Sequence, residues 1–179
     1  MALTVTWLGH ATWRISTPEG QHVLIDAWID TNPACPEPAK AAAKANVDAV
    51  LLTHGHFDHI NDIGAIAAAN PGVKVACQFD LAPFLESRGV PADAIIGFNC
   101  GGTVPVAGME ATMTAAMHSS TLNQNGQIIP LGESIGFVLR MSNGFTIYHT
   151  GDTSVTSDMG IIGKLYKPDL AILPIGDWF

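Results

Sequence analysis

The sequence predicts an α/β protein in which helices pack outside a core of two sheets. In the first half, short strand patterns alternate with helical ones, whereas strand patterns dominate after residue 102. Eighteen glycines and eleven prolines separate these segments, as many short connections require. The 179 residues, 47% apolar and only 13% charged, suffice for one domain with a sizeable core.

The elements of the first half follow from side-chain type and from the residues that break regular structure. Runs rich in β-branched and aromatic residues, separated by turn residues such as Pro18 and Gly20, predict strands. An alanine-rich run predicts a helix, and Asp80 is expected to be the N-cap of another. In chain order we predict strands at 3–9, 12–17 and 22–27, a helix at 38–46, a strand at 47–53, a helix at 60–70, a strand at 73–78, a helix at 80–89 and a strand at 94–98.

Strands are the main prediction for the second half. Asn143 and Gly144, between two apolar runs, are a strong hairpin signal, and Pro168 is expected to stop the last helix. The stretch 119–133 is expected to be a loop in which Asn123 and its neighbours either bind a polar ligand or cap a turn. The predicted order is strands at 103–108, 110–118, 133–142 and 144–151, a helix at 157–168 and a buried strand at 169–176.

Charge and cysteine content narrow the class of protein. A formal net charge of −8, with only eight basic residues and no stretch that concentrates them, argues against a nucleic-acid partner. Cys35, Cys77 and Cys100 show no CxxC spacing, so we expect reduced thiols in a cytoplasmic protein. The N-terminus shows no signal-peptide pattern and no apolar run approaches about 18 residues, so no membrane partner is predicted.

The stretch LLTHGHFDH concentrates imidazole and carboxylate groups directly after a buried strand. His54, His56, Asp58 and His59 fall within six positions. Groups placed just beyond the end of a buried strand are held rigidly and reach into a crevice. Because histidine nitrogen and carboxylate oxygen are the donors that zinc, manganese or iron takes, this spacing predicts a metal site.

Two later strand ends can complete that site. A zinc hydrolase needs about three protein ligands per metal and an open position for water. The β-like run ATMTAAMH ends at His118, and FTIYHTGDT runs into Gly151 and Asp152. Either residue alone would more often cap a turn or lie on the surface, but together with the histidine cluster they are expected to be ligands.

These motifs resemble the metallo-β-lactamase superfamily. THGHFDH, the single downstream His118 and the GDT at 151–153 carry the resemblance. WLGHAT at 7–12, LIDAW at 24–28 and LYKPDLAILPIGD at 165–177 are similar to the bacterial metal-dependent hydrolases related to L-ascorbate-6-phosphate lactonase. The resemblance covers nearly the whole chain. It implies a four-layer αβ/βα sandwich and two divalent metal ions, zinc first, with manganese or iron as alternatives.

The family pattern also implies a role for each site residue. Asp58 would be catalytic, because it can orient a metal-bridging hydroxide that acts as nucleophile. Asp26 would lie behind the ligands and fix an imidazole tautomer, although a strand-end turn carboxylate is an equal alternative. His10 would line the site or serve only as a loop histidine, and His149 is as well explained by packing. The first metal would be held by His54, His56 and His118, the second by Asp58 and His59, and both by Asp152.

The sequence departs from the family at its C-terminal side. The family has one more ligand, a histidine downstream of the LPIGD strand, and no histidine follows His149 here. We therefore expect residues 1–179 to form one domain that lacks a C-terminal strand and helix and leaves the run 169–175 poorly covered. A separate or processed C-terminal piece is the favoured explanation. A crippled second site, or completion by a neighbouring subunit of a homo-oligomer, is the alternative.

Two functions from different classes remain. The first is a metal-dependent hydrolase that acts on a small ester, lactone or phosphodiester. The second is a non-catalytic metal-binding or scaffold domain with a degraded second metal site. The first predicts about two metals per protomer and turnover that a chelator abolishes, whereas the second predicts at most one metal and no turnover.

Overall fold

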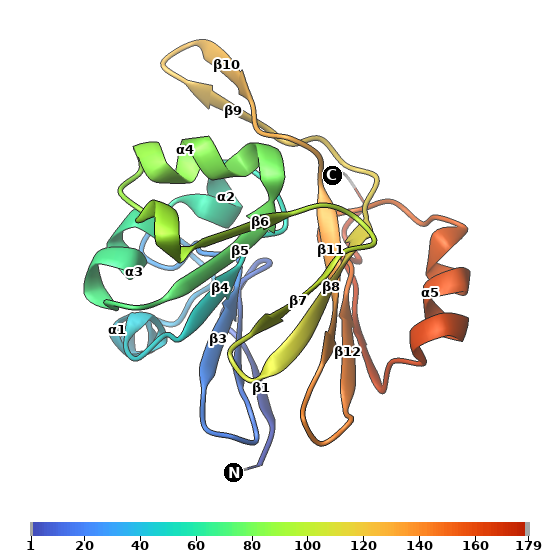
Figure 1. Cartoon of the computed structure of the whole chain (residues 1–179). Helices are drawn as coiled ribbons and strands as arrows, with labels where there is room; N and C mark the ends of the chain where they lie inside the picture. The colour runs from blue at the N-terminus through green and yellow to red at the C-terminus, as the bar shows by residue number, and fades with distance from the viewer. Residues whose placement is uncertain (1, 178–179) are drawn as a thin grey trace.

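Two β-sheets face each other in the structure, a computed structural model that describes residues 2–177. Four helices, α1 to α4, cover the outer face of the first sheet, and α5 covers the outer face of the second (Figure 1). The layers therefore run helix, sheet, sheet, helix. The predicted αβ/βα sandwich is confirmed.

The first sheet joins an antiparallel β-meander to a parallel half. Its strand order is β1-β2-β3-β4-β5-β6, antiparallel from β1 to β3 and parallel from β3 to β6. Parallel neighbours need crossovers, and helices supply them. The strands are β1 (Thr4–Trp7), β2 (Trp13–Ser16), β3 (His22–Ile25), β4 (Ala49–Leu51), β5 (Lys74–Gln78) and β6 (Ile95–Phe98). The helices are α1 (Glu37–Lys44), α2 (Phe57–Ile60), α3 (Ile63–Ala69) and α4 (Ala82–Ser87), with 3-10 turns η1 (Phe79–Leu81) and η2 (Ala92–Ala94).

The second sheet is mainly antiparallel. Its order is β13-β12-β11-β8-β7, and only the β12–β13 pair is parallel. A separate hairpin, β9–β10, projects away from both sheets (Figure 1). The elements are β7 (Thr103–Val106), β8 (Met109–Ala115), β9 (Thr121–Gln124), β10 (Gln127–Pro130), β11 (Ile135–Arg140), β12 (Thr146–His149), α5 (Asp158–Tyr166) and β13 (Leu170–Ile172).

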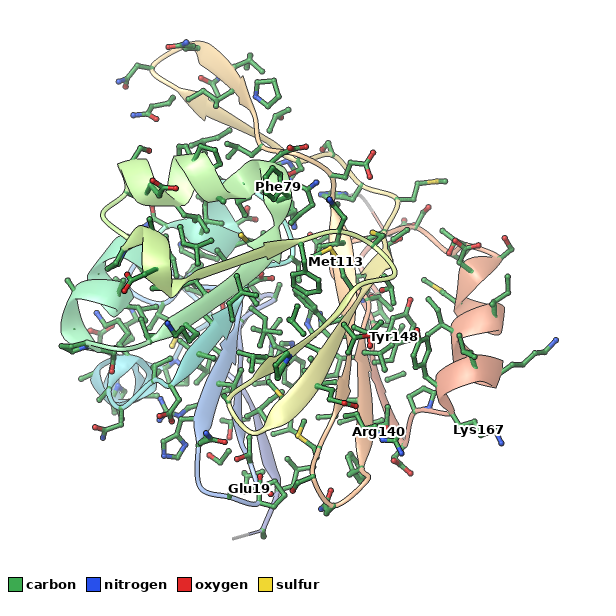
Figure 2. The ribbon with its side chains drawn as sticks, viewed as in Figure 1. Glu19, Phe79, Met113, Arg140, Tyr148 and Lys167 are labelled. Carbon is green, nitrogen blue, oxygen red and sulfur yellow. The ribbon has the colours of Figure 1, made fainter. Side chains whose placement is uncertain are left out.

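Strand alternation divides the core into three layers. In β3, Leu24 packs under the helices, whereas Val23 and Ile25 face the second sheet, as the two-residue period of a strand requires. Figure 2 shows Met113 between the two sheets and Tyr148 between the second sheet and α5. Because the first sheet is buried on both faces, its parallel strands are apolar runs rather than alternating ones.

The structure corrects three predicted elements. The expected loop 119–133 contains the hairpin β9–β10, whose two-residue turn Asn125–Gly126 has positive φ at both positions, the signature of a type I′ turn. In place of the expected helix 60–70 there are two helices: α2, which starts earlier, at Phe57, and α3, which starts at Ile63. Asp80 is not an N-cap: it lies within η1, and the side chain of Gln78 accepts a hydrogen bond from its backbone N–H.

The end of the second sheet exposes apolar side chains. A fourth element also differs from its prediction: in place of the buried strand expected at 169–176, β13 has only three residues, forms the sheet edge and contains no buried residue. Leu173 and Ile175 beyond it are 49% and 96% exposed, so the predicted poor cover of this run is confirmed. All three cysteines are free. No helix within residues 2–177 is long and apolar enough to cross a membrane.

Candidate metal centre

Four connections bring the predicted site residues together. They are the turn between β1 and β2, the segment after β4, and the ends of β8 and β12. A fifth segment, the end of β3, adds Asp26. Three overlapping triplets of His and Asp residues are close enough to share an ion: within each triplet, one ligand atom from every residue lies within 4.8 Å of the others. The triplets are His54–His56–His118, His10–Asp58–His59 and His54–His59–Asp152. All eight predicted site residues belong to this group or touch it: His10, Asp26, His54, His56, Asp58, His59, His118 and Asp152.

The first triplet contains three imidazoles. Nε2 of His54 lies 2.9 Å from Nδ1 of His56, and Nε2 of His118 lies 3.3 Å from the same Nδ1. Two nitrogens bound to one zinc ion at about 2.1 Å are about 3.4 Å apart in a tetrahedron. The spacing of these three nitrogens is therefore that of a metal-ligand set.

The second group combines imidazoles with carboxylates. Nε2 of His59 lies 3.4 Å from Oδ2 of Asp152, and Nε2 of His10 lies 3.0 Å from Oδ2 of Asp58. Oδ2 of Asp152 also lies 3.9 Å from Nε2 of His118. Asp152 thus contacts both groups.

A buried carboxylate and hydroxyl fix the orientation of two histidines. Asp26 is fully buried, and its Oδ2 lies 2.6 Å from Nδ1 of His59. The Thr53 hydroxyl lies 3.0 and 2.9 Å from the two Asp26 oxygens and 3.0 Å from Nδ1 of His54. A hydroxyl has one proton, which goes to Asp26, so Oγ1 accepts from the Nδ1–H of His54. Both imidazoles therefore turn Nε2 toward the site, as a metal ligand requires.

Protonation differs between the two groups. Burial, and then the neighbouring imidazoles, lower the pKa of His54 to about 2, and burial and His118 lower that of His56. Burial also opposes a charge on His59, but Asp26 and Asp152 outweigh it and raise its pKa to about 10. Burial likewise opposes ionisation of Asp152, yet the close contact and positive charge of His59, followed by the imidazoles of His54 and His118, hold its pKa well below the usual range.

The hydrogen bonding of His59 gives a further reason to think that this cluster holds a cation. Nε2 of His59 is buried and has no hydrogen-bond partner among the described residues; the 3.4 Å contact with Asp152 is at ion-pair distance but lacks hydrogen-bond geometry. An orphaned buried nitrogen is costly unless something binds it. A metal ion would bind this nitrogen and offset the negative charge of Asp58 and Asp152.

Sequence reasoning assigned no role to three residues that support the cluster. Thr53 stands inside the quoted motif, and its hydroxyl joins Asp26 to His54. Nδ1 of the buried His149 accepts the N–H of Gly151 at 3.1 Å and so shapes the turn that carries Asp152. Ser120 accepts the N–H of Gly55 at 3.1 Å. The sequence signal that could have identified Thr53 and His149 is their position close to His54 and Asp152 along the chain.

A cavity of about 570 Å³ opens beside the cluster, within the usual range for small-molecule sites. His10 and Asp152 are its polar groups nearest the cluster, and its walls include Trp7 and Trp13 on one side. The last residue of β13, Ile172, and the segment after it, through Asp177, also line the cavity. A small, largely apolar ligand placed here would touch His10 and Asp152 directly.

The fold and this cluster together define a metallo-β-lactamase-fold protein with a histidine- and aspartate-rich site at the sheet ends. The chain belongs to the β-lactamase superfamily domain family, whose model matches residues 21–179. Its relatives include the UPF0173 metal-dependent hydrolases, so the chain is a member of that group of metal-dependent hydrolases.

Two relatives and one solved structure illustrate the similarity. A protein from Chloroflexus aurantiacus is 59% identical over 99% of this chain and 72% of its own length. One from Roseiflexus sp. is 58% identical over 98% of this chain and 72% of its own length. A metallo hydrolase from the archaeon Ignicoccus hospitalis matches with a TM-score of 0.81 at 30% identity, and the match covers 98% of this chain and 71% of that one.

Proposed function

We propose that this protein is a hydrolase that holds two divalent metal ions and acts on a small ester, lactone or phosphodiester. The buried Nε2 of His59, which has no hydrogen-bond partner among the described residues, is the observation that supports the proposal most strongly. A divalent metal ion would satisfy this nitrogen, and both the family and the surrounding imidazole and carboxylate donors are suited to such an ion. The proposed ligands of the first ion are His54, His56 and His118. Those of the second are Asp58 and His59, and Asp152 bridges the two.

The chain's own residues supply orientation and charge. Two bound ions would lower the pKa of a bound water and offset the negative charge that builds on the attacked carbonyl or phosphoryl group. Asp58 is proposed as the catalytic carboxylate that orients the nucleophile. Burial disfavours its ionisation, but the hydrogen bond from His10 and the charge of His59 lower its pKa, so it is an acceptor at neutral pH.

The substrate is proposed to be small, with an apolar part. The apolar walls of the cavity and the exposed indole of Trp7 support this proposal. Zinc is the proposed metal because the donors are imidazole and carboxylate, although manganese and iron accept the same donors. The three free cysteines support a cytoplasmic location.

We also propose that a companion segment or second chain packs against the end of the second sheet and donates a histidine to the second metal ion. The exposed Leu173 and Ile175 beside the cavity support this, because such side chains are usually covered. Gel filtration and intact-mass analysis of purified material test it. One species that matches residues 1–179 and does not associate would count against a companion.

Metal analysis and a substrate panel test the function. Protein dialysed against zinc- or manganese-containing buffer should retain about two ions per chain by elemental analysis. It should also hydrolyse at least one of p-nitrophenyl acetate, a γ-lactone and bis-p-nitrophenyl phosphate, and a chelator should abolish that turnover. Asp152→Asn is the inactive comparison. Metal-free protein after this treatment would refute the proposal, whereas one bound ion and no turnover on the panel would favour the non-catalytic metal-binding domain.

A further inference from the structure

His10 occupies a turn whose shape is fixed by the chain around it. It joins β1 to β2 and has a φ of 51°, in the left-handed region. The indole N–H of Trp7 donates to the His10 carbonyl at 2.8 Å, and the Asn32 side chain donates to the Gly9 carbonyl at 3.1 Å. A non-glycine residue adopts this conformation only where contacts from the surrounding structure hold the backbone in place.

The turn aims the imidazole at the second metal group. Nε2 of His10 lies 3.0 Å from Oδ2 of Asp58, and its ring packs edge-on against Trp28 and His59 at centroid distances of 5.3 and 5.2 Å. One ligand atom each from His10, Asp58 and His59 lies within 4.8 Å of the other two. Donors that share an ion at about 2.1 Å in an octahedron are about 3.0 Å apart when adjacent, so the 3.0 Å contact is also a ligand-to-ligand distance.

We propose that His10 is itself a ligand of the second metal ion, alongside Asp58 and His59. With Asp152, the second centre then has four donors within the described residues, and a histidine from the proposed companion would add a fifth. This inference rests on the proposed two-metal site. The competing role is a hydrogen bond to Asp58 alone, in which His10 holds that carboxylate or passes a proton to the leaving group.

Replacement by glycine separates these roles without damage to the turn. A positive φ suits glycine better than histidine, so His10→Gly should fold at least as well as the wild type. His22→Ala is the matched control, since His22 contacts Ser16 at the start of β3, the opposite end of the strand from Asp26, and belongs to none of the triplets. Equilibrium dialysis against graded free zinc, with elemental analysis, and the visible spectrum of the cobalt-loaded protein are the readouts.

We expect the wild type and His22→Ala to bind two ions. His10→Gly should keep the first ion with unchanged affinity and bind the second more than about 100-fold more weakly, since loss of a group that only orients a ligand costs about 10–100-fold. A loss within that smaller range would assign His10 the hydrogen bond to Asp58 alone and overturn the inference. Added imidazole should restore the second ion and the wild-type cobalt spectrum. Wild-type affinity for both ions in His10→Gly would overturn the inference, even if turnover fell, as would a wild-type chain that binds only one ion. A wild type that binds none would instead refute the proposed function.

Discussion

Thr53→Val removes one hydroxyl and keeps the shape of the side chain. Thr53 is fully buried, and its Oγ1 donates to Asp26 while it accepts the Nδ1–H of His54 at 3.0 Å. After the substitution His54 has a buried N–H without an acceptor, whereas Asp26 keeps the Thr53 backbone N–H and His59 as donors. The loss is therefore mainly one unsatisfied buried donor, which costs about 1–3 kcal/mol.

This cost is measurable in two ways. For a domain of this size, 2 kcal/mol corresponds to a fall in Tm of roughly 4–8 °C, which thermal unfolding of the metal-free protein would report. The first metal ion should bind about 10–100-fold more weakly, because its ligand His54 has lost the group that fixes its tautomer. Isothermal titration with zinc would measure that change.

Thr53→Ser is the control that decides the cause. Serine keeps the hydroxyl and loses only a methyl group, so it should retain most of the affinity for the first ion. The reasoning would be refuted if Thr53→Val matched Thr53→Ser in both Tm and zinc affinity. It would also be refuted if both variants lost affinity equally, since the methyl group rather than the hydroxyl would then matter.

Further predictions concern pH, proton release and the Asp152 turn. The raised pKa of His59 means that its contribution to stability is complete below about pH 6.5 and is lost as the pH rises through about 10; urea unfolding of the metal-free protein across this range should show the decline, and Asp26→Asn should flatten it. Zinc binding at pH 7 should release a proton from His59, seen as a dependence of the calorimetric heat on the buffer's ionisation enthalpy and absent in His59→Gln. Gly151→Ala should destabilise by at least about 1–3 kcal/mol, since the added Cβ would lie 2.2 Å from the Ile135 carbonyl oxygen at a φ of 64°; wild-type stability in urea would show that the turn relaxes.

The sequence could predict which residues form the site where those residues directly follow a recognisable strand. The apolar run before His54 marks a buried strand, and runs that end at His118 and near Asp152 mark two more. Parallel and antiparallel strand ends meet at the edges of sheets, so residues 54, 118 and 152 could be expected together without a topology. The structure does bring them into one group.

Backbone conformation and turn type were not predictable in the same way. The pair Asn125–Gly126 forms a tight type I′ turn, whereas Asn143–Gly144 lies in a five-residue connection between β11 and β12. The first pair was missed because TLNQ and QIIP lack the apolar alternation that flanks the second. The contact of His10 with Asp58 likewise depends on a left-handed residue, and no side-chain pattern in WLGHAT specifies it.

Asp26 should give the two proposed metal centres different affinities for a metal ion at neutral pH. It acts on His54 only through the Thr53 hydroxyl, and burial keeps that imidazole neutral with an unprotonated Nε2. It contacts His59 directly and, with Asp152, holds a proton there. A neutral donor binds a cation without loss of a proton, whereas a protonated one must release it first. The first centre should therefore fill at lower metal concentration than the second, and the difference should narrow as the pH rises toward 10, because deprotonation of His59 then no longer opposes binding.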